Sequence, residues 1–406
     1  MVHYQNGQLF CEQVALADVV AGVGTPVYVY SLFELLERAQ AYVTANTSLA
    51  CYAVKANGNP HLLRHLGKAG MGADVTSGGE LFLAQQAGIP PEKIILSGVG
   101  KTAAEIEMAL TADIRALHVE SKMELTAVSQ IAARLQKKAH IGIRVNPNIS
   151  AETHPYISTG QHSHKFGVPL AQAQAMFAKA AQDNWLEPVG IASHIGSQIR
   201  DVDPFRQTAV FLTEVADELK AQGISLRYID VGGGLGIDYT GDGVPTIAEW
   251  TTAVSGPVQE AGYGLVIEPG RSIVGPSGIM IAQTVYTKKQ GNKQFVITDA
   301  GMNDLLRPTL YKAYHPILPL QRRHGPEQIV DIVGPICESG DWLAKERPLP
   351  PIHQGDLLAF LQAGAYGFAM GSNYNGRLRP AEVLVDGHSF TIIRQRQTFE
   401  HLLDGT

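Results

Sequence analysis

Cysteine and charge are both scarce in this chain of 406 residues. The three cysteines, Cys11, Cys51 and Cys337, are too few and too far apart for a disulfide framework or a zinc site, and they favour a reducing compartment. Charged residues make up 17% of the chain and the formal net charge is -6, which argues against a protein that binds nucleic acids or anionic membranes. We therefore expect no metal, no nucleic acid and no membrane among its partners.

Long apolar runs are also missing. No uninterrupted apolar stretch is long enough to span a bilayer, and the first residues lack the basic region and apolar core of a signal peptide. A cytoplasmic protein is the expectation. Hydrophobic residues still reach 45%, which predicts a large core and excludes a disordered or fibrous chain, and the length favours two domains.

Short apolar segments alternate with amphipathic ones between residues 30 and 276. This alternation predicts βαβ units and a parallel sheet. A (β/α)8 TIM barrel needs eight such units over roughly 250 residues, and a doubly wound open sheet is the alternative. The candidate strands number eight and read LACYAVKAN, GADVTSGGE, KIILSGVG, ALHVES, HIGIRVNP, GIASHIGSQ, YIDVGGGLG and LVIEPGR.

The polar residues favour the barrel, because each candidate strand ends in one of them or in a glycine run. A barrel gathers all the carboxyl ends of its strands on one face, where barrel active sites are built. The polar connection 150–170 is expected to form a loop or lid over that face. The strand-end residues are Lys55, Asp74 with Ser77, Ser97, Glu120, Arg144 with Asn146, His194 with Ser197, glycines 232 to 234, and Glu268 with Arg271.

The pattern changes after about residue 276. Short β-rich segments separated by Gly, Asn and Asp predict an antiparallel β-sandwich domain over 277–406. The strand-like TPVYVYS near the N-terminus indicates that residues 1–29 join this domain. The expected barrel then covers 30–276.

Two strand ends suggest cofactor chemistry. Lys55 at a barrel mouth would be partly desolvated, which lowers the pKa of an amine and makes it nucleophilic, although a lysine that simply extends into solvent is the alternative. The glycines after YIDV expose backbone N–H groups that can hold a phosphate, and the loop after the seventh strand is a usual phosphate site in barrels. A tight turn without a ligand is the alternative there.

Four further residues have both chemical and structural interpretations. Glu268, buried at the mouth, needs a cationic or protonated partner, and Arg271 either grips an anion or pairs with that acid. His194 is positioned to lie against an aromatic ring or to serve as a structural histidine, and Cys337 is reactive or an inert core thiol. Together these residues supply what pyridoxal phosphate requires: an amine, a phosphate cradle, an acid for the pyridine nitrogen and a stacking ring.

These motifs resemble the fold-type III pyridoxal-phosphate-dependent decarboxylases and, within that family, the diaminopimelate decarboxylases. The resemblance covers nearly the whole chain and implies a PLP-binding barrel, a β-sandwich built from both chain ends, and a homodimer with shared active sites. The motifs occur in the family's order as YAVKAN, ADVTSGGEL, HIGSQ, DVGGGLG, EPGRSIV, MNDLLRPTLY, GPICESGDWLA and GAYGFAMGSNYNGR.

The resemblance also implies roles. Lys55 matches the lysine that forms the aldimine, Glu268 the acid that supports the pyridinium, and Cys337 the proton donor that comes from the partner subunit. The remaining cofactor-binding positions are Asp74, His194, Ser197, Gly233, Gly234, Gly270, Arg271 and Tyr366. The implied substrate contacts are Arg271, Arg307, Tyr311, Glu338 and Tyr366.

The implied activity is that of a carboxy-lyase which converts meso-2,6-diaminopimelate to L-lysine and CO2, the last step of lysine biosynthesis. The distal carboxylate and ammonium of that substrate call for a guanidinium and an acid, which Arg307 and Glu338 supply. A decarboxylase of relaxed specificity, an amino-acid racemase, a non-catalytic PLP-binding protein and a class I aldolase are the alternatives.

Overall fold

The computed structural model describes residues 1–45, 47–149 and 165–406. They form two compact units. The barrel unit consists of Arg38–Ile237 and Val244–Ser272, and the β unit consists of Met1–Glu37, Asp238–Gly243 and Ile273–Thr406. The domain boundaries expected from the sequence, with the barrel at 30–276, stay a prediction.

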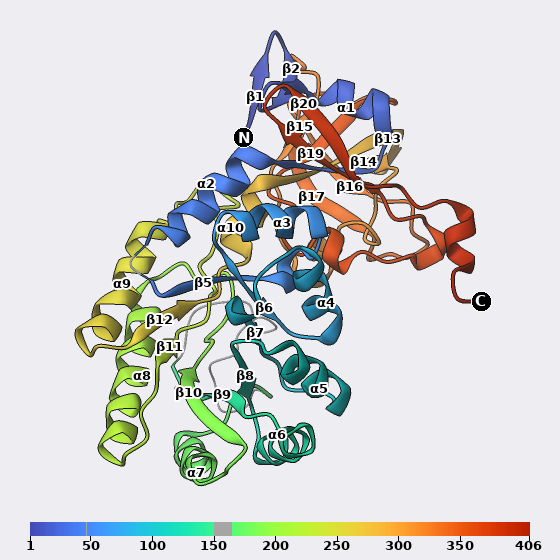
Figure 1. Ribbon diagram of the computed structural model, residues 1–406. Coiled ribbons are helices and arrows are strands. Elements are labelled where there is room, and N and C mark those ends of the chain that lie inside the picture. The colour runs from blue at the N-terminus through green and yellow to red at the C-terminus, as the bar shows by residue number, and fades with distance from the viewer. Residues whose placement is uncertain (46, 150–164) are drawn as a thin grey trace. The chain divides into compact units, whose positions relative to one another are not determined.

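Eight parallel strands close into a barrel in the barrel unit, which confirms the predicted fold and excludes the open sheet (Figure 1). The strands follow one another around the barrel in chain order, and the last pairs with the first. They are β5 (Leu49–Ala53), β6 (Gly72–Val75), β7 (Ile94–Leu96), β8 (Ala116–Val119), β9 (Ala139–Arg144), β10 (Leu186–Ala192), β11 (Tyr228–Asp230) and β12 (Gly264–Ile267).

Helices follow the strands and begin close to the barrel mouth. Ser77, Thr102 and Ser121 each cap a helix by accepting a hydrogen bond from the backbone N–H of a glutamate three residues later, so the chain turns into a helix soon after leaving a strand. The helices of this unit are α3 (Pro60–Lys68), α4 (Gly78–Gln86), α5 (Ala103–Ala112), α6 (Lys122–Leu135), α7 (Leu170–Ala181), α8 (Asp203–Ala221) and α9 (Ile247–Glu260), and the 3-10 turn Val54–Ala56 follows β5.

The β unit contains a small antiparallel sheet and a nine-stranded one. The small sheet is β1 (Val2–Gln5), β2 (Gln8–Cys11) and β3 (Val14–Ala15), followed by α1 (Leu16–Val23). The large sheet is β4 (Val27–Ser31), β13 (Gly278–Gln290), β14 (Lys293–Thr298), β15 (Ile317–Pro319), β16 (Gln328–Val333), β17 (Trp342–Leu349), β18 (Leu357–Phe360), β19 (Ala381–Asp386) and β20 (Ser389–Arg394).

The large sheet takes in the N-terminal strand, as predicted, because β4 pairs with both β13 and β19. The expectation of a purely antiparallel sheet was wrong, since β19 pairs with β4 in parallel and β14 pairs with β16 in parallel. Parallel neighbours need a long connection, and most of the chain separates β4 from β19. The strand pairing therefore makes the sheet mixed.

Three segments complete the description. Helix α2 (Leu32–Val43) and helix α10 (Arg271–Ser277) contain the junctions between the two units, and α11 (Arg307–Tyr311) belongs to the β unit. Most of the segment 150–170, expected to form a loop or lid, lies outside the described residues. None of the helices in the described ranges combines the length and the apolar character needed to cross a bilayer.

Candidate active site

The carboxyl ends of the barrel strands surround a cavity of about 410 Å³. Its lining comes from strands that lie far apart in the sequence, as the barrel prediction required. Several predicted strand-end residues meet there, and one residue not singled out from the sequence, His118, joins them. The polar lining includes Lys55, Ser97, His118, Arg144, His194 and Glu268.

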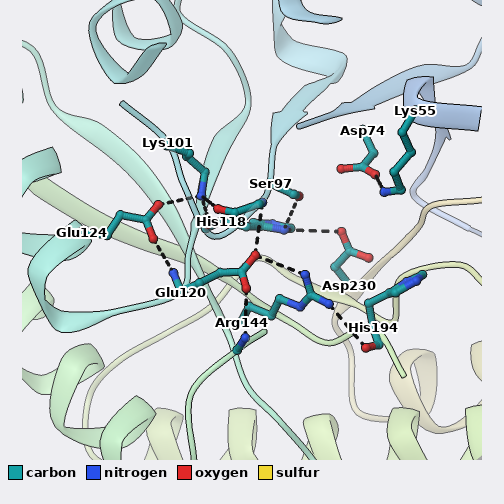
Figure 2. A network of polar contacts seen from close by, with 12 residues as sticks. Lys55, Asp74, Ser97, Lys101, His118, Glu120, Glu124, Arg144, His194 and Asp230 are labelled. Atoms are coloured by element: carbon teal, nitrogen blue, oxygen red, sulfur yellow. Dashed lines mark hydrogen bonds and ion pairs between the residues drawn. The ribbon is translucent and has the colours of Figure 1, made fainter. Parts of the chain in front are cut away.

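Lys55 faces a fixed acid. It lies in the 3-10 turn after β5, and its Nζ is 2.6 Å from Oδ2 of Asp74, a fully buried residue near the carboxyl end of the neighbouring strand β6 (Figure 2). Burial raises the pKa of Asp74, but the charge and hydrogen bond of Lys55 outweigh it and hold that pKa below its usual value. Asp74 orients the amine at the edge of the cavity.

Two more buried acids, Asp230 and Glu268, stand at the carboxyl ends of β11 and β12. Burial, with the charges of Asp230 and Asp74, raises the pKa of Glu268 well above its usual value. Burial also raises the pKa of Asp230, to about 7. Two carboxyls in such surroundings resist full ionisation unless a cation or a proton accompanies them. Glu268 is thus suited to face a cationic N–H group in the cavity.

His118 lies beneath the cavity on β8 and is 1% exposed. Its Nε2 is 2.9 Å from the hydroxyl of Tyr228, and burial lowers the pKa of its imidazole to about 3. The ring is therefore neutral at physiological pH. His118 was not singled out from the sequence because it lies within an apolar strand. The signal that reveals it is glycine on the neighbouring strand β9, since a Cβ at Gly142, which pairs with His118, would lie 2.5 Å from the ring.

The glycine run after β11 packs where no side chain fits. A Cβ on Gly233 would lie 2.0 Å from the carbonyl oxygen of Glu268, and one on Gly234 would lie 2.2 Å from that of Gly196. Gly234 also has a φ of 114°, which favours glycine. The backbone of this loop thus lies directly against its neighbours and leaves N–H groups as its only donors, as a phosphate cradle requires.

Other predicted cofactor residues adjoin this loop. The N–H of Gly233 donates to Nδ1 of His194 at 3.2 Å, and Nη2 of Arg271 donates to Oγ of Ser197 at 3.0 Å. Burial, with the charges of Arg144 and Lys55, lowers the pKa of His194 to about 3, so its ring is neutral. A neutral, half-buried ring is suitable for stacking on an aromatic ligand. The last predicted position, Gly270, packs close to the Ala53 methyl group.

Arg144 ties several loops at the mouth together. Its Nη1 lies 3.1 Å from Oε1 of Glu120, and its Nη2 lies 3.5 Å from the carbonyl of His194 (Figure 2). Glu120 accepts further hydrogen bonds from the N–H groups of Gly98 and Gly167. Sequence reasoning gave Glu120 only as a strand-end residue. In the structure it anchors the loops that follow β7 and β9.

The remaining predicted residues lie in the β unit, on segments that hydrogen bonds join to one another. Arg307 and Tyr311 begin and end the short helix α11, Cys337 and Glu338 lie in the loop 334–341, and Tyr366 lies in the loop before the turn 373–377 with a φ of 55°. The connecting bonds are Met302 N to Asp341 Oδ1 at 2.7 Å, Thr309 Oγ1 to the Gly340 carbonyl at 2.8 Å, and Cys337 N to Asn375 Oδ1 at 2.8 Å.

Arg307 is buried and its orientation is fixed. Its Nη1 lies 2.8 Å from Nε2 of His315, whose Nδ1 lies 2.9 Å from the carbonyl oxygen of Leu361. A carbonyl only accepts, so Nδ1 carries the imidazole proton and Nε2 accepts from the guanidinium. The guanidinium also lies 4.8 Å from the centre of the Tyr239 ring, within cation–π range. Arg307 is thus held in place before any ligand arrives.

Cys337 differs from the other two cysteines. Burial raises the pKa of the Cys11 thiol to about 12 and that of Cys51 well above its usual value, whereas Cys337 and its neighbour Glu338 are exposed. The alternative of an inert core thiol is therefore wrong for Cys337, because the loop 334–341 is on the surface of its unit. An exposed thiol is accessible for chemistry in a way that the buried two are not.

Comparisons with known proteins agree along the whole chain. The family model for the pyridoxal binding domain of pyridoxal-dependent decarboxylases matches residues 32–275. The diaminopimelate decarboxylase of Aquifex aeolicus is 46% identical over 405 residues, which cover 99% of this chain and 96% of that protein. The diaminopimelate decarboxylase of Neisseria meningitidis serogroup A is 45% identical and covers 97% of each chain.

Solved structures give the same result. The diaminopimelate decarboxylase of Helicobacter pylori complexed with L-lysine superposes with a TM-score of 0.93 at 42% identity, covering 96% of this chain and 98% of that one. The M. jannaschii diaminopimelate decarboxylase in co-complex with L-lysine has a TM-score of 0.94 at 35% identity, covering 99% and 96%. Similarity therefore includes the β unit as well as the barrel.

Proposed function

The chain belongs to the pyridoxal-dependent decarboxylases, and from this premise we propose that it removes one carboxylate of meso-2,6-diaminopimelate as CO2 to give L-lysine, the last step of lysine biosynthesis. The observation that carries this choice is the length of the similarity. It covers 99% of the chain, and so includes the loops of Arg307 and Cys337, whereas the family model alone matches only residues 32–275. The enzyme is a pyridoxal-phosphate-dependent carboxy-lyase.

The residues of the barrel cavity fit the cofactor. Its pyridine nitrogen calls for an acid, and Glu268 is a buried acid whose pKa is raised by burial and by the neighbouring carboxyls of Asp230 and Asp74, so a cationic N–H group against it would be stabilised. Its phosphate calls for backbone donors, and the loop of Gly233 and Gly234 offers backbone N–H groups at a place where a Cβ would collide with the carbonyl oxygens of Glu268 and Gly196. The buried Oγ of Ser193 lines the same cavity without a hydrogen-bond partner among the described residues. These observations support a polar aromatic phosphate in this cavity.

The cofactor-binding residues have separate tasks in this proposal. Lys55 carries the cofactor and Asp74 orients its amine, while His194 stacks on the ring and Glu268 faces the pyridine nitrogen. When bound, the cofactor accepts the electron pair that the departing CO2 leaves on the substrate. The phosphate is held by Ser197, Gly233, Gly234, Gly270, Arg271 and Tyr366.

The proton step belongs to the β unit. We assign the donor to Cys337 of the partner subunit in a homodimer, whose thiol gives a proton to the carbon that has lost its carboxylate. The exposed position of Cys337 supports this assignment, because a residue that completes a partner's site must be accessible on its own chain. The homodimer and the cytoplasmic location remain predictions.

Substrate choice rests on charge. After one amino-acid end of diaminopimelate has reacted, the other still carries a carboxylate and an ammonium group. The buried, pre-positioned guanidinium of Arg307 suits the carboxylate and the exposed carboxylate of Glu338 suits the ammonium. Arg271, Tyr311 and Tyr366 complete the proposed contacts.

The test is CO2 release from meso-diaminopimelate, with and without added pyridoxal phosphate, beside ornithine, arginine and lysine at equal concentrations. We expect turnover that depends on the cofactor and strongly favours diaminopimelate. Comparable rates on all four substrates would instead indicate relaxed specificity. Interconversion of enantiomers without CO2 would indicate a racemase, and either result would overturn the proposal.

A further inference from the structure

The interior of the barrel contains a column of buried polar side chains. Barrel interiors are usually filled by branched apolar residues. Here Tyr228 and His118 lie in the interior, and glycine on the neighbouring strands leaves room for them, since a Cβ at Gly190, the residue on β10 that pairs with Tyr228, would lie 2.4 Å from the Tyr228 ring. The guanidinium of Arg115 lies 5.1 Å from the centre of the same ring. The column leads from the amino end of β8 up to the cavity.

Asp230 stands at the top of this column. It is the last residue of β11 and is fully buried. Its Oδ1 accepts a hydrogen bond of 2.8 Å from the N–H of Gly232, at the start of the glycine loop. Its Oδ2 is buried without a hydrogen-bond partner in the part of the chain that the structure describes, and lies 4.0 Å from Nδ1 of His118.

Asp230 also adjoins the acid proposed for the pyridine nitrogen. A ring nitrogen of His118 and one carboxyl oxygen from each of Asp230 and Glu268 all lie within 4.8 Å of one another. We propose that Asp230 is a positioning residue for the cofactor: its Oδ1 fixes the glycine loop, and its carboxyl shares one proton with Glu268. This inference rests on the proposed placement of the phosphate at the loop and of the pyridine nitrogen at Glu268.

The shared proton follows from the surroundings. Two buried carboxyls this close do not both ionise readily, and the pKa of Asp230 is raised to about 7. The imidazole of His118, with a pKa of about 3, does not take the proton. The other titratable or charged groups that interact with the pair are Asp74 on β6, Lys55 after β5, Cys51 on β5, Arg144 on β9 and Tyr228 on β11, and Arg115 before β8 acts in turn on Cys51 and Tyr228.

A cation against Glu268 favours ionisation of the pair, so binding of the ring releases the shared proton. Below the pKa of the pair, affinity should therefore rise with pH, and above it affinity should level off. Replacing Asp230 by asparagine removes the like charge that raises the pKa of Glu268. The inflection should then move to lower pH.

The experiment titrates the full-length, cofactor-free enzyme with pyridoxine 5'-phosphate, whose alcohol cannot react with Lys55. Titration of the ligand itself is the same for every variant and cancels between them. Asp230→Asn keeps an acceptor for Gly232 N–H, so we expect the inflection of affinity against pH to fall by about one unit or more while the loop contact survives.

A second arm tests the loop. Asp230→Ala and Asp230→Leu remove the acceptor for Gly232, and the leucine fills the space of the aspartate in case the alanine variant does not fold. We expect the preference for pyridoxine 5'-phosphate over unphosphorylated pyridoxine to fall roughly tenfold in both, and to stay unchanged in Asp230→Asn. The matched control is Asp331→Asn, a buried aspartate on β16 that also accepts a backbone N–H, from Glu346.

The outcomes separate the two ideas. A uniform loss of affinity at every pH in Asp230→Asn would mean that Asp230 is only structural, and an unchanged phosphate preference in the alanine and leucine variants would refute the loop contact. A wild-type enzyme that binds pyridoxal phosphate but releases no CO2 from diaminopimelate would overturn the proposed function and leave this inference standing.

Discussion

The acid–base candidates of the two units differ in their exposure. In the barrel unit, Asp74 and Glu268 are buried, and Lys55 is paired with one of them at 2.6 Å. In the β unit, Cys337 and Glu338 are exposed on a surface loop. A cofactor that is used repeatedly needs a fixed, desolvated site, whereas a proton donor that completes a partner's site must be accessible. The contrast matches the division of labour that we propose.

Electrostatics follows the same division. In the barrel unit, raised pKa values of Asp230 and Glu268 and lowered values of His118 and His194 gather around one cavity. The β unit has its own buried acid, Asp304, whose pKa burial raises to about 7, but its carboxylate serves the loop before α11 through a bond to the N–H of Gly301. A shifted pKa marks a candidate site only where such groups converge on a cavity.

The largest expected effect comes from Lys55→Ala, which removes the amine at the centre of the barrel network. We expect CO2 release to fall on the order of a thousandfold or more and the visible absorbance of the protein-bound cofactor to change, because no other group takes over the amine's role. The control is Lys93→Ala, which should keep turnover, because Lys93 directly precedes the amino end of β7 and the cavity lies at the carboxyl ends of the strands. Substantial turnover without Lys55 would refute its role as the residue that carries the cofactor.

The next effect tests the exposed loop. Cys337→Ala should be nearly inactive on its own, while Ser339→Ala, two residues away in the same loop, should not. If each site takes Lys55 from one chain and Cys337 from its partner, mixing the Lys55→Ala and Cys337→Ala enzymes under subunit exchange restores one site in each hybrid dimer. Half the dimers are hybrids, so activity should recover to about a quarter of wild type.

The mixing experiment has a clear failure. Differently tagged subunits show whether hybrids have formed. If hybrids are present and activity does not recover, Lys55 and Cys337 act within one chain, and exposure of Cys337 then needs another explanation. The measurement is the rate of CO2 release per dimer at several mixing ratios.

A smaller effect is expected from Arg307, the buried candidate of the β unit. Arg307→Ala should lower kcat/KM on diaminopimelate about a hundredfold, as expected for loss of a charge-assisted contact of a few kcal/mol. The preference for diaminopimelate over lysine should fall with it. Arg379→Ala, a half-buried arginine that packs on the Phe368 ring, is the matched control. An unchanged preference would show that another residue reads the distal carboxylate.

Local sequence signals account for most of the fold. Each barrel strand is a short apolar segment followed by a polar end, and capping residues such as Thr102 mark where helices begin, so the eight units were predictable in order. The parallel pairing of β4 with β19 was not, because nothing near Val27 indicates which distant strand it will join. Pairing between remote segments depends on the complete fold.

The site was predictable to the extent that it lies at strand ends. Lys55, Asp74 and Glu268 follow apolar segments and stand out in the sequence. His118 and Tyr228 lie within strands, where a single polar or aromatic residue looks like ordinary core. Their partnership depends on space left by glycine on other strands, which only the closed barrel reveals.

The smallest expected effect concerns the barrel unit and is a change with pH in the stability of the cofactor-free chain. An unfolded histidine titrates near 6.5, whereas burial lowers the pKa of His118 to about 3. Between these values the unfolded state binds a proton that the folded state does not. The free energy of unfolding should therefore fall by about 1.4 kcal/mol for each unit that the pH is lowered through this window, and the full contribution is present above pH 6.5.

Two variants isolate this contribution in urea unfolding at pH 7.5, 6 and 5. His118→Gln removes the titrating ring, so its stability should decline less steeply than that of wild type by about 1.4 kcal/mol per pH unit. Tyr228→Phe removes the hydrogen bond to the ring but leaves the imidazole buried, so it should be less stable at every pH while keeping the slope of wild type. Equal slopes for His118→Gln and wild type would show that the imidazole takes up its proton inside the folded barrel. The assignment of a neutral imidazole to His118, next to Asp230 and Glu268, would then be wrong.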